Sequence, residues 1–189
     1  GRGVLVDPGD EPARILAMVQ SAGATIEAIW LTHGHLDHIG AVEALRRELE
    51  VPVLLHVADL PLYRRASQQA ANYGLPFEQP TDPDGELREG DELTVGGLRF
   101  TVRQTPGHAP GHVVFLGDTF MVGGDLLFAG SIGRTDLPLS DPEAMERSVA
   151  LVAGFEPGIV VYPGHGPPTN IGAELASNPF LHHAYQARS

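Results

Sequence analysis

The chain has 189 residues, of which 42% are hydrophobic and 19% are charged, a composition typical of one globular domain over residues 1–189. Its formal net charge of −12 argues against nucleic acid as a partner, because phosphate binding needs a basic face, and none of its apolar runs approaches the roughly 20 residues that cross a bilayer. The absence of cysteine excludes disulfide bonds, thiolate metal ligands and a cysteine nucleophile.

The first half of the chain alternates strand and helix patterns. A short apolar strand over residues 4–6 lies so close to Gly1 that we expect a leading segment to be missing, and without a signal-peptide pattern we expect a cytoplasmic protein with no membrane partner. The elements that follow are a helix over residues 12–22, a strand over 26–31, a helix over 41–49 and a strand over 51–56. This alternation predicts βαβ units and a mainly parallel sheet.

The second half contains shorter strands and more prolines. Residues 58–83 are expected to form an exposed helix and a loop near the functional site, and the Gly96-Gly97 pair between two apolar runs predicts a β-hairpin over residues 93–102. A helix over residues 143–152 is expected to be capped by Asp141, with Pro142 in its first turn. Further strands are predicted over residues 113–116, 120–122 and 159–162.

Residues 32–40 read THGHLDHIG and place three histidines and an aspartate within six positions, directly after a predicted strand. Imidazole and carboxylate are ligands that zinc, iron and manganese sites use. Alternate residues of an extended segment point the same way, so His33 and His35 can bind one ion together. Asp37 and His38 are adjacent, so at least one of them points elsewhere. The motif predicts a metal site, with two ions, whose other ligands come from elsewhere in the chain.

Three further loops carry candidate ligands, and each follows a strand-like run. They contain His108 in the segment TPGH, Asp125 in GGD and His165 in GHG. Binding sites in open α/β sheets assemble beyond the carboxyl ends of the strands, and glycines beside each candidate allow the backbone to approach closely. We therefore expect these loops to converge on the first motif.

Five segments together resemble the metallo-β-lactamase-fold superfamily and, within it, the small bacterial branch of glyoxalase II-like, or hydroxyacylglutathione hydrolase-like, enzymes. They are VDPG at 6–9, THGHLDHIG at 32–40, TPGHAPGH at 105–112, GDLLFAGSIGRTDLP at 124–138 and PGHGPPTNIGAELASNPFL at 163–181. The segments occur in the family's order and span almost the whole chain. The resemblance implies an α/β (α+β) fold, a four-layer αβ/βα sandwich with the site at one edge of its two sheets.

The resemblance also implies a set of metal ligands. It assigns His33, His35 and His108 to one metal ion, assigns Asp37, His38 and His165 to a second, and makes Asp125 the bridge between them. The cofactor expected is therefore a pair of divalent ions, with zinc preferred and iron or manganese as alternatives, since nitrogen and oxygen ligands accept all three.

Three other residues have expected roles and open alternatives. Asp7 and His112 are expected to support the ligands from behind; the alternatives are an ordinary turn aspartate and a histidine satisfied within a strand. Arg134 matches a basic position that contacts the thiol carrier in glyoxalase II enzymes, so we expect it to bind substrate. The alternative is that Arg134 pairs with Asp136 or caps a helix.

The function implied by the resemblance is hydrolysis of a small thioester such as hydroxyacylglutathione. Two ions about 3.5–4 Å apart can share a hydroxide and polarise a carbonyl, and zinc lowers the pKa of bound water to about 7. Asp37 could also accept a proton as the reaction intermediate collapses. The partner expected is thus a small-molecule thioester, while the oligomeric state is left open.

Other functions of the same fold are weighed against this one. The strongest alternative is a persulfide dioxygenase with one iron on His33, His108 and Asp125; such enzymes share the GRTD string at 133–136 but commonly carry cysteine at the position of His112. A lactonase uses the same ligands and stays open. A β-lactamase of the common subclass would need cysteine at position 125, an RNA-processing nuclease would need basic surfaces, and a non-catalytic domain would have lost ligands.

One departure from glyoxalase II bears on the substrate. Long members of that family add a helical region that grips glutathione, and because the sequence ends at Ser189 we expect this chain to lack it. They also place a tyrosine two residues after the last metal histidine, where this chain has Pro167. The identity of the thiol carrier is therefore left open.

Overall fold

The computed structural model describes residues 1–181, and the chain divides into two compact units. The N-terminal unit comprises residues 1–87 and 94–98, and the C-terminal unit comprises residues 88–93 and the chain from residue 99 onward. None of the helices within residues 1–181 has the length and apolar character needed to cross a membrane. The expectation of a single domain over residues 1–189 stays a prediction.

The N-terminal unit is built on a parallel sheet, as the sequence predicts. Its four strands lie in the order β1-β2-β3-β4, and each pair of neighbours is parallel. The strands are β1 (Arg2–Val6), β2 (Thr25–Trp30), β3 (Val53–Leu55) and β4 (Gly85–Glu86). The helices are α1 (Pro12–Ser21), α2 (Leu36–Ile39), α3 (Val42–Leu49), η1 (Val57–Asp59), α4 (Leu60–Tyr63) and α5 (Ala66–Asn72).

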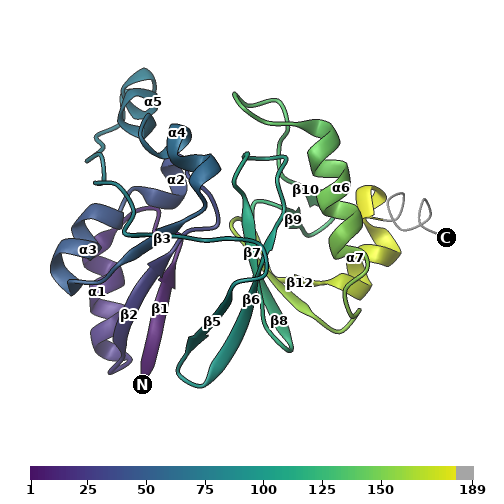
Figure 1. Ribbon diagram of the computed structural model, residues 1–189, viewed down its shortest axis with the longest axis horizontal. Coiled ribbons are helices and arrows are strands. Elements are labelled where there is room, and N and C mark those ends of the chain that lie inside the picture. The colour runs from purple at the N-terminus through teal and green to yellow at the C-terminus, as the bar shows by residue number, and fades with distance from the viewer. Residues whose placement is uncertain (182–189) are drawn as a thin grey trace. The chain divides into compact units, whose positions relative to one another are not determined.

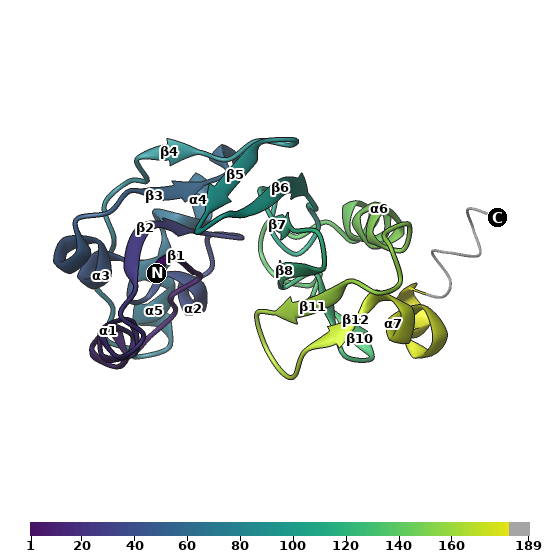
Figure 2. The same cartoon turned by 90° about the horizontal axis from the view of Figure 1, so that it is seen from below.

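Helices α1 and α3 lie on the same side of this sheet (Figures 1 and 2). Val42 and Leu45, three residues apart on α3, are fully buried and belong to the same apolar cluster as Ile29 of β2 and Val53 of β3. Burying each such side chain stabilises the fold by about 1.5–3 kcal/mol. This apolar core fixes the sheet and so determines where the loops after its strands lie.

The C-terminal unit contains a mixed sheet of six strands in the order β12-β11-β8-β7-β6-β5. β7 is antiparallel to both β6 and β8, whereas β8 and β11 are parallel. The strands are β5 (Glu92–Val95), β6 (Leu98–Gln104), β7 (Val113–Leu116), β8 (Phe120–Gly124), β11 (Val160–Pro163) and β12 (Thr169–Asn170). A separate small hairpin joins β9 (Leu127–Phe128) to β10 (Ser131–Ile132).

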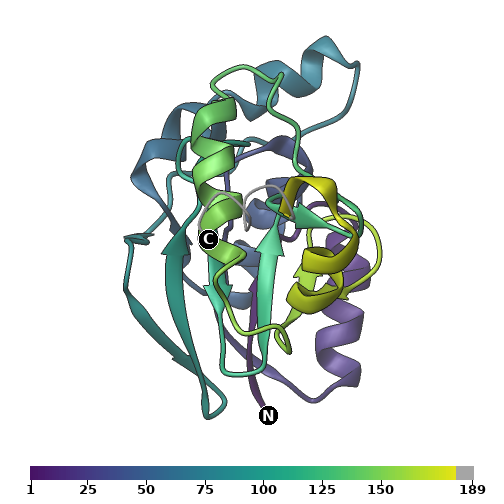
Figure 3. The ribbon, with the colours of Figure 1, turned by 90° about the vertical axis from the view of Figure 1, so that its right-hand side faces the viewer.

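Two helices, α6 (Pro142–Val152) and α7 (Ile171–Ser177), cover one face of the C-terminal sheet, and Figure 3 shows them in green and yellow in front of its strands. The carboxylate of Asp141 accepts a hydrogen bond from the amide of Ala144 and Pro142 opens the helix, which confirms the predicted cap. Met145 and Val149, four residues apart on α6, pack into an apolar cluster with β7, β8 and β11.

Candidate metal site

In the N-terminal unit, the predicted ligands follow β2 at the carboxyl edge of the sheet. Val6 of β1 lies opposite Trp30 of β2, so Asp7 and the motif at 32–40 leave the sheet at the same edge. The chain stays extended at His35 and then forms α2, whose first residues include Asp37 and His38. Successive helical residues point about 100° apart, so the two side chains diverge. His38 is buried, whereas the Asp37 side chain is 51% exposed.

Two glycines allow the loop after β1 to contact α2 through backbone alone. A Cβ atom on Gly9 would lie 1.8 Å from the carbonyl oxygen of Asp37, and one on Gly40 would lie 2.2 Å from the carbonyl oxygen of Gly9. Any side chain at either position would force the two segments apart. The glycines of VDPG and THGHLDHIG therefore bring Asp7 close to the histidines.

The Asp7 carboxylate organises the histidines of the N-terminal unit. Its Oδ1 accepts a hydrogen bond from the Thr32 amide at 2.7 Å, and its Oδ2 accepts one from the Thr32 hydroxyl at 2.5 Å. The same Oδ2 lies 3.0 Å from Nδ1 of His38, and the Thr32 hydroxyl oxygen lies 3.0 Å from Nδ1 of His33. One carboxylate thus holds His38 directly and His33 through Thr32.

This network fixes the tautomer of two imidazoles. A carboxylate only accepts hydrogen bonds, so His38 donates its Nδ1–H to Asp7. The Thr32 hydroxyl spends its single proton on Asp7, so it accepts from the Nδ1–H of His33. Both histidines then carry their lone pair on Nε2, the form that a metal ligand requires.

The three imidazoles of the motif lie close together. The ring of His33 is 4.8 Å from that of His35 and 4.1 Å from that of His38, measured between ring centroids. Ligand atoms of Asp7, His33 and His38 also lie within 4.8 Å of one another. Because the Asp7 carboxylate is already bound to Thr32 and His38, we interpret it as a support for these histidines, and its role behind a metal centre stays a prediction.

In the C-terminal unit, parallel strands β8 and β11 bring two predicted ligands to one edge. Gly124 pairs with Pro163, and the Gly164 amide donates to the Gly124 carbonyl at 2.8 Å. Asp125 and His165 therefore follow directly from neighbouring strands, and Oδ2 of Asp125 lies 3.6 Å from Nε2 of His165. The Asp125 side chain is buried, and that of His165 is 54% exposed.

His108 reaches the same carboxylate from the loop after β6. Its Nε2 lies 3.5 Å from Oδ2 of Asp125, and its Nδ1 donates to the backbone carbonyl of Arg134 at 2.9 Å. The second bond leaves the lone pair on Nε2, facing Asp125. Two ligands bound to zinc at about 2.0–2.1 Å in a tetrahedron lie about 3.3–3.4 Å apart. The separations around Asp125 are close to this value.

His112 holds the backbone of Asp125. Its Nε2 accepts a hydrogen bond from the Asp125 amide at 3.0 Å, so its proton is on Nδ1, which donates to the Thr105 hydroxyl at 2.9 Å. The ring is fully buried and both its nitrogens are engaged with protein atoms. With both nitrogens engaged, the ring has no lone pair left for a metal, and the role of His112 behind the ligands stays a prediction.

Glycines again allow close packing behind these ligands. A Cβ atom on Gly133 would lie 1.9 Å from the carbonyl oxygen of Asp125 and 3.4 Å from Cβ of His108. A Cβ atom on Gly107, where φ is +143°, would lie 2.4 Å from Cα of Met145 on α6. The GRTD segment and helix α6 therefore pack directly against the backbone that carries His108 and Asp125.

Arg134 pairs with Asp136, which is the alternative to substrate binding that the sequence left open. Its guanidinium donates two parallel hydrogen bonds to the Asp136 carboxylate, each at 2.9 Å, and both side chains are about two-thirds exposed. The hydrogen bond from Arg134 lowers the pKa of Asp136 below its usual value. The backbone of Arg134 nevertheless lies against His108 through its carbonyl. Its role in substrate binding stays a prediction.

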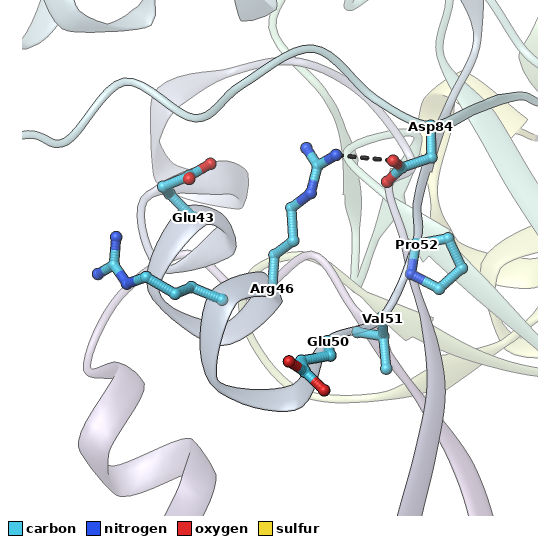
Figure 4. Close-up of a pocket in the computed structure, with 7 residues that line it drawn as sticks. Glu43, Arg46, Glu50, Val51, Pro52 and Asp84 are labelled. Atoms are coloured by element: carbon cyan, nitrogen blue, oxygen red, sulfur yellow. Dashed lines mark hydrogen bonds and ion pairs between the residues drawn. The ribbon is translucent and has the colours of Figure 1, made fainter.

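A pocket of about 410 Å³ lies at the opposite end of the N-terminal sheet, where β3 and β4 begin (Figure 4). Arg46 crosses it and donates to the carbonyls of Thr81 and Asp82 and to the carboxylate of Asp84. These bonds engage the guanidinium within the fold. The lining residues are Glu43, Arg46, Arg47, Glu50, Val51, Pro52 and Asp84.

Two threonines that bind predicted site residues were not expected from the sequence. Thr32 binds Asp7 and His33, and Thr105 binds His112, in both cases through the hydroxyl. Each threonine opens one of the recognised segments, THGH or TPGH, so the signal was available. Within each unit the structure brings the predicted residues together, and their assignment as metal ligands stays a prediction.

Comparison with known proteins gives the chain its relatives. A family model described as the metallo-beta-lactamase superfamily matches residues 1–165. The hydroxyacylglutathione hydrolase GloC of Haemophilus influenzae is 36% identical over 182 residues, which cover 94% of this chain and 86% of the relative.

Two solved structures are similar to the whole fold. TTHA1623 in a di-iron-bound form has a TM-score of 0.89 and 47% identity, over 94% of this chain and 89% of that one. The BLEG-1 B3 metallo-beta-lactamase has a TM-score of 0.86 and 36% identity, over 95% of this chain and 88% of that one. These likenesses confirm the fold class predicted from the sequence.

Proposed function

We propose that this chain, a metallohydrolase that belongs to the metallo-β-lactamase superfamily, hydrolyses small thioesters at a centre of two divalent metal ions. The ligand assignment is the one that the resemblance implies: three histidines for one ion, two histidines and Asp37 for the other, and Asp125 shared by both. A relative at 36% identity is a hydroxyacylglutathione hydrolase, which supports the thioester as the substrate class.

One observation carries the proposal of two metals. A single oxygen of Asp125 lies within 3.6 Å of Nε2 of both His108 and His165, which the resemblance assigns to different ions. A mononuclear centre of two histidines and one aspartate has no use for His165. The position of Asp125 beside both imidazoles supports a bridging carboxylate.

The donor set fits the proposed metals. Buried imidazoles with their lone pairs on Nε2, together with carboxylates, suit zinc, iron and manganese, and we propose zinc. Iron is the alternative, since TTHA1623 was solved with two irons bound. When bound, two such ions supply a Lewis acid for the thioester carbonyl and an activated water for its hydrolysis.

The chain's own residues would orient the metal ligands and exchange protons beside the ions. Asp7 and Thr32 hold two imidazoles, and His112 holds the backbone of Asp125. We propose that the exposed Asp37 side chain, besides its role as a ligand, accepts a proton as the reaction intermediate collapses. Arg134 can exchange the Asp136 carboxylate for an anionic group of the thiol carrier, because an exposed ion pair is held only weakly.

β-Lactam hydrolysis is a second candidate, favoured by the 36% identity and TM-score of 0.86 to a B3 metallo-beta-lactamase. In both reactions a water-derived nucleophile attacks a carbonyl carbon. The two substrate classes can therefore be compared in one assay series. The protein, loaded with zinc or iron, would be incubated with acyl thioesters of glutathione and of other small thiols, and with a chromogenic cephalosporin.

We expect release of free thiol from the thioesters and a much slower reaction with the cephalosporin. Asp125→Asn keeps the shape of the side chain but weakens its metal binding, so it should abolish thiol release. Faster turnover of the cephalosporin would support the second candidate, and a metal-loaded protein that leaves every thioester intact would refute the proposal.

A further inference from the structure

Asp59 is a fully buried carboxylate that has no part in the predicted ligand set. It immediately precedes α4, whose sequence begins Leu60-Pro61, and an aspartate before such a helix is typical of an N-cap. Its side chain makes no capping hydrogen bond. The carboxylates of Asp141 and Asp59 stand at equivalent places in their helices, but only that of Asp141 caps.

The Asp59 carboxylate instead contacts the metal motif. Its Oδ2 accepts a hydrogen bond from the backbone amide of Gly34 at 2.9 Å. Gly34 is the residue between His33 and His35, and a Cβ atom on it would lie 3.0 Å from both the carbonyl oxygen of Asp59 and the amide of Tyr63. The start of α4 thus packs against the bare backbone between the two histidines.

This contact sets the geometry of the histidine pair. His33 and His35 can face one ion only while the peptide between them keeps its orientation, and glycine supplies no side chain to hold it. A hydrogen bond from an amide to a carboxylate is about twice as strong as one between neutral groups. Burial shields it from competition by water.

We propose that Asp59 is a positioning residue, which fixes the Gly34 peptide and thereby aligns His33 and His35 on one metal ion. The inference rests on the metal centre of the proposed function but not on its substrate. Its test therefore measures metal binding and does not require turnover of a substrate.

The test compares Asp59 with a matched aspartate of the same unit. Asp84 also accepts a backbone hydrogen bond, from the Val53 amide at 2.8 Å, but at the opposite end of β3 (Figure 4). The variants are Asp59→Asn, which keeps an acceptor oxygen for Gly34, Asp59→Leu, which removes it, and Asp84→Leu as the control. Metal-free protein would be titrated with zinc against a chromogenic chelator, with circular dichroism as the check on folding.

We expect Asp59→Leu to lower zinc affinity by about 10- to 100-fold, the range for residues that orient metal ligands. Asp59→Asn, whose neutral oxygen still accepts from Gly34 but more weakly, should lose much less affinity than Asp59→Leu. Asp84→Leu should lose stability without losing affinity. If Asp59→Leu does not fold, Asp59→Ser, whose hydroxyl is too short to reach Gly34, replaces it with the same expected loss.

Three outcomes would overturn the inference. They are wild-type affinity in Asp59→Leu or its serine replacement, an equal loss in Asp84→Leu, and a loss in Asp59→Asn as large as in Asp59→Leu. A wild-type protein that binds zinc but cleaves no thioester would refute the proposed substrate and leave this inference standing.

Discussion

Oδ2 of Asp7 lies 3.0 Å from Nδ1 of His38 and accepts its hydrogen bond, while the same carboxylate also binds the amide and hydroxyl of Thr32. Three donors therefore converge on one side chain. An asparagine in its place would offer one acceptor oxygen and turn an amide N–H toward the others, so the network could not re-form. The backbone would tolerate the change, because asparagine accepts the left-handed φ of +48° found at Asp7.

We predict that Asp7→Asn lowers metal affinity by about 10- to 100-fold. Chelator competition measures the loss, and Asp10→Asn is the control, since the exposed Asp10 carboxylate accepts a hydrogen bond from the amide of its neighbour Glu11, outside the Asp7 network. Equal affinities of the two variants would show that Asp7 does not orient the ligands.

His112 provides a second prediction. Replacing it by leucine leaves the buried amide of Asp125 without its acceptor, which should destabilise the metal-free protein by about 1–3 kcal/mol and lower its metal content. His112→Gln can place an oxygen near the position of Nε2 and should recover part of both losses. Urea unfolding and elemental analysis test this, and a leucine variant with wild-type values in both would contradict it.

Arg134 provides a third. If it binds an anionic part of the substrate, Arg134→Ala should reduce kcat/KM by about tenfold to a hundredfold through KM, the effect of losing a charge-assisted hydrogen bond, with metal content unchanged. Asp136→Asn frees the guanidinium from its bidentate partner and should lower KM. Normal kinetics in Arg134→Ala would mean that the residue serves only its pair with Asp136.

His56 gives a prediction on pH. Burial lowers the pKa of its imidazole below the ordinary 6.5, and its Nδ1 accepts a hydrogen bond from the Ala58 amide. As the pH falls, His56 is therefore protonated in the unfolded chain before it is protonated in the folded chain. Neutral His56 contributes its full stabilisation of the fold at pH values above 6.5. This stabilisation is lost as the pH falls from 6.5 toward the lowered pKa of the folded state.

His56→Asn keeps an acceptor for the Ala58 amide but cannot titrate. We expect the metal-free wild type to lose more stability than this variant between about pH 7.5 and about pH 5.5, in urea unfolding at both values. The other histidines are common to both proteins, so the difference reports His56. Identical pH dependence would contradict the prediction.

Elements with a regular apolar pattern could be predicted from the sequence. The continuous run at residues 113–116 is β7, and Asp141-Pro142 marks the start of α6. Several very short elements, such as α2, β9 and β12, were not predicted, because so few residues show no periodicity. α7 was also not predicted, although asparagine is a typical N-cap residue and Asn170 caps this helix.

The candidate site also has a part that the sequence predicts and a part that it does not. Ligand candidates are recognisable in the sequence because histidine and aspartate cluster after strands. The groups that hold these ligands cannot be recognised there, since a threonine hydroxyl or a buried carboxylate has many possible partners. Only the register of β1 beside β2 places Asp7 next to Thr32, and only the turn before α4 aims Asp59 at Gly34.

Hydrolysis at a two-metal centre is tested most directly by the origin of the product's oxygen. The metal-loaded protein would turn over an acyl thioester in ¹⁸O-labelled water without dioxygen, with metal per chain measured on the same sample. Our account predicts two metal ions per chain and one labelled oxygen in the carboxylate product. One iron per fully loaded chain, with turnover of a persulfide that consumes dioxygen and no label in a carboxylate, would contradict it.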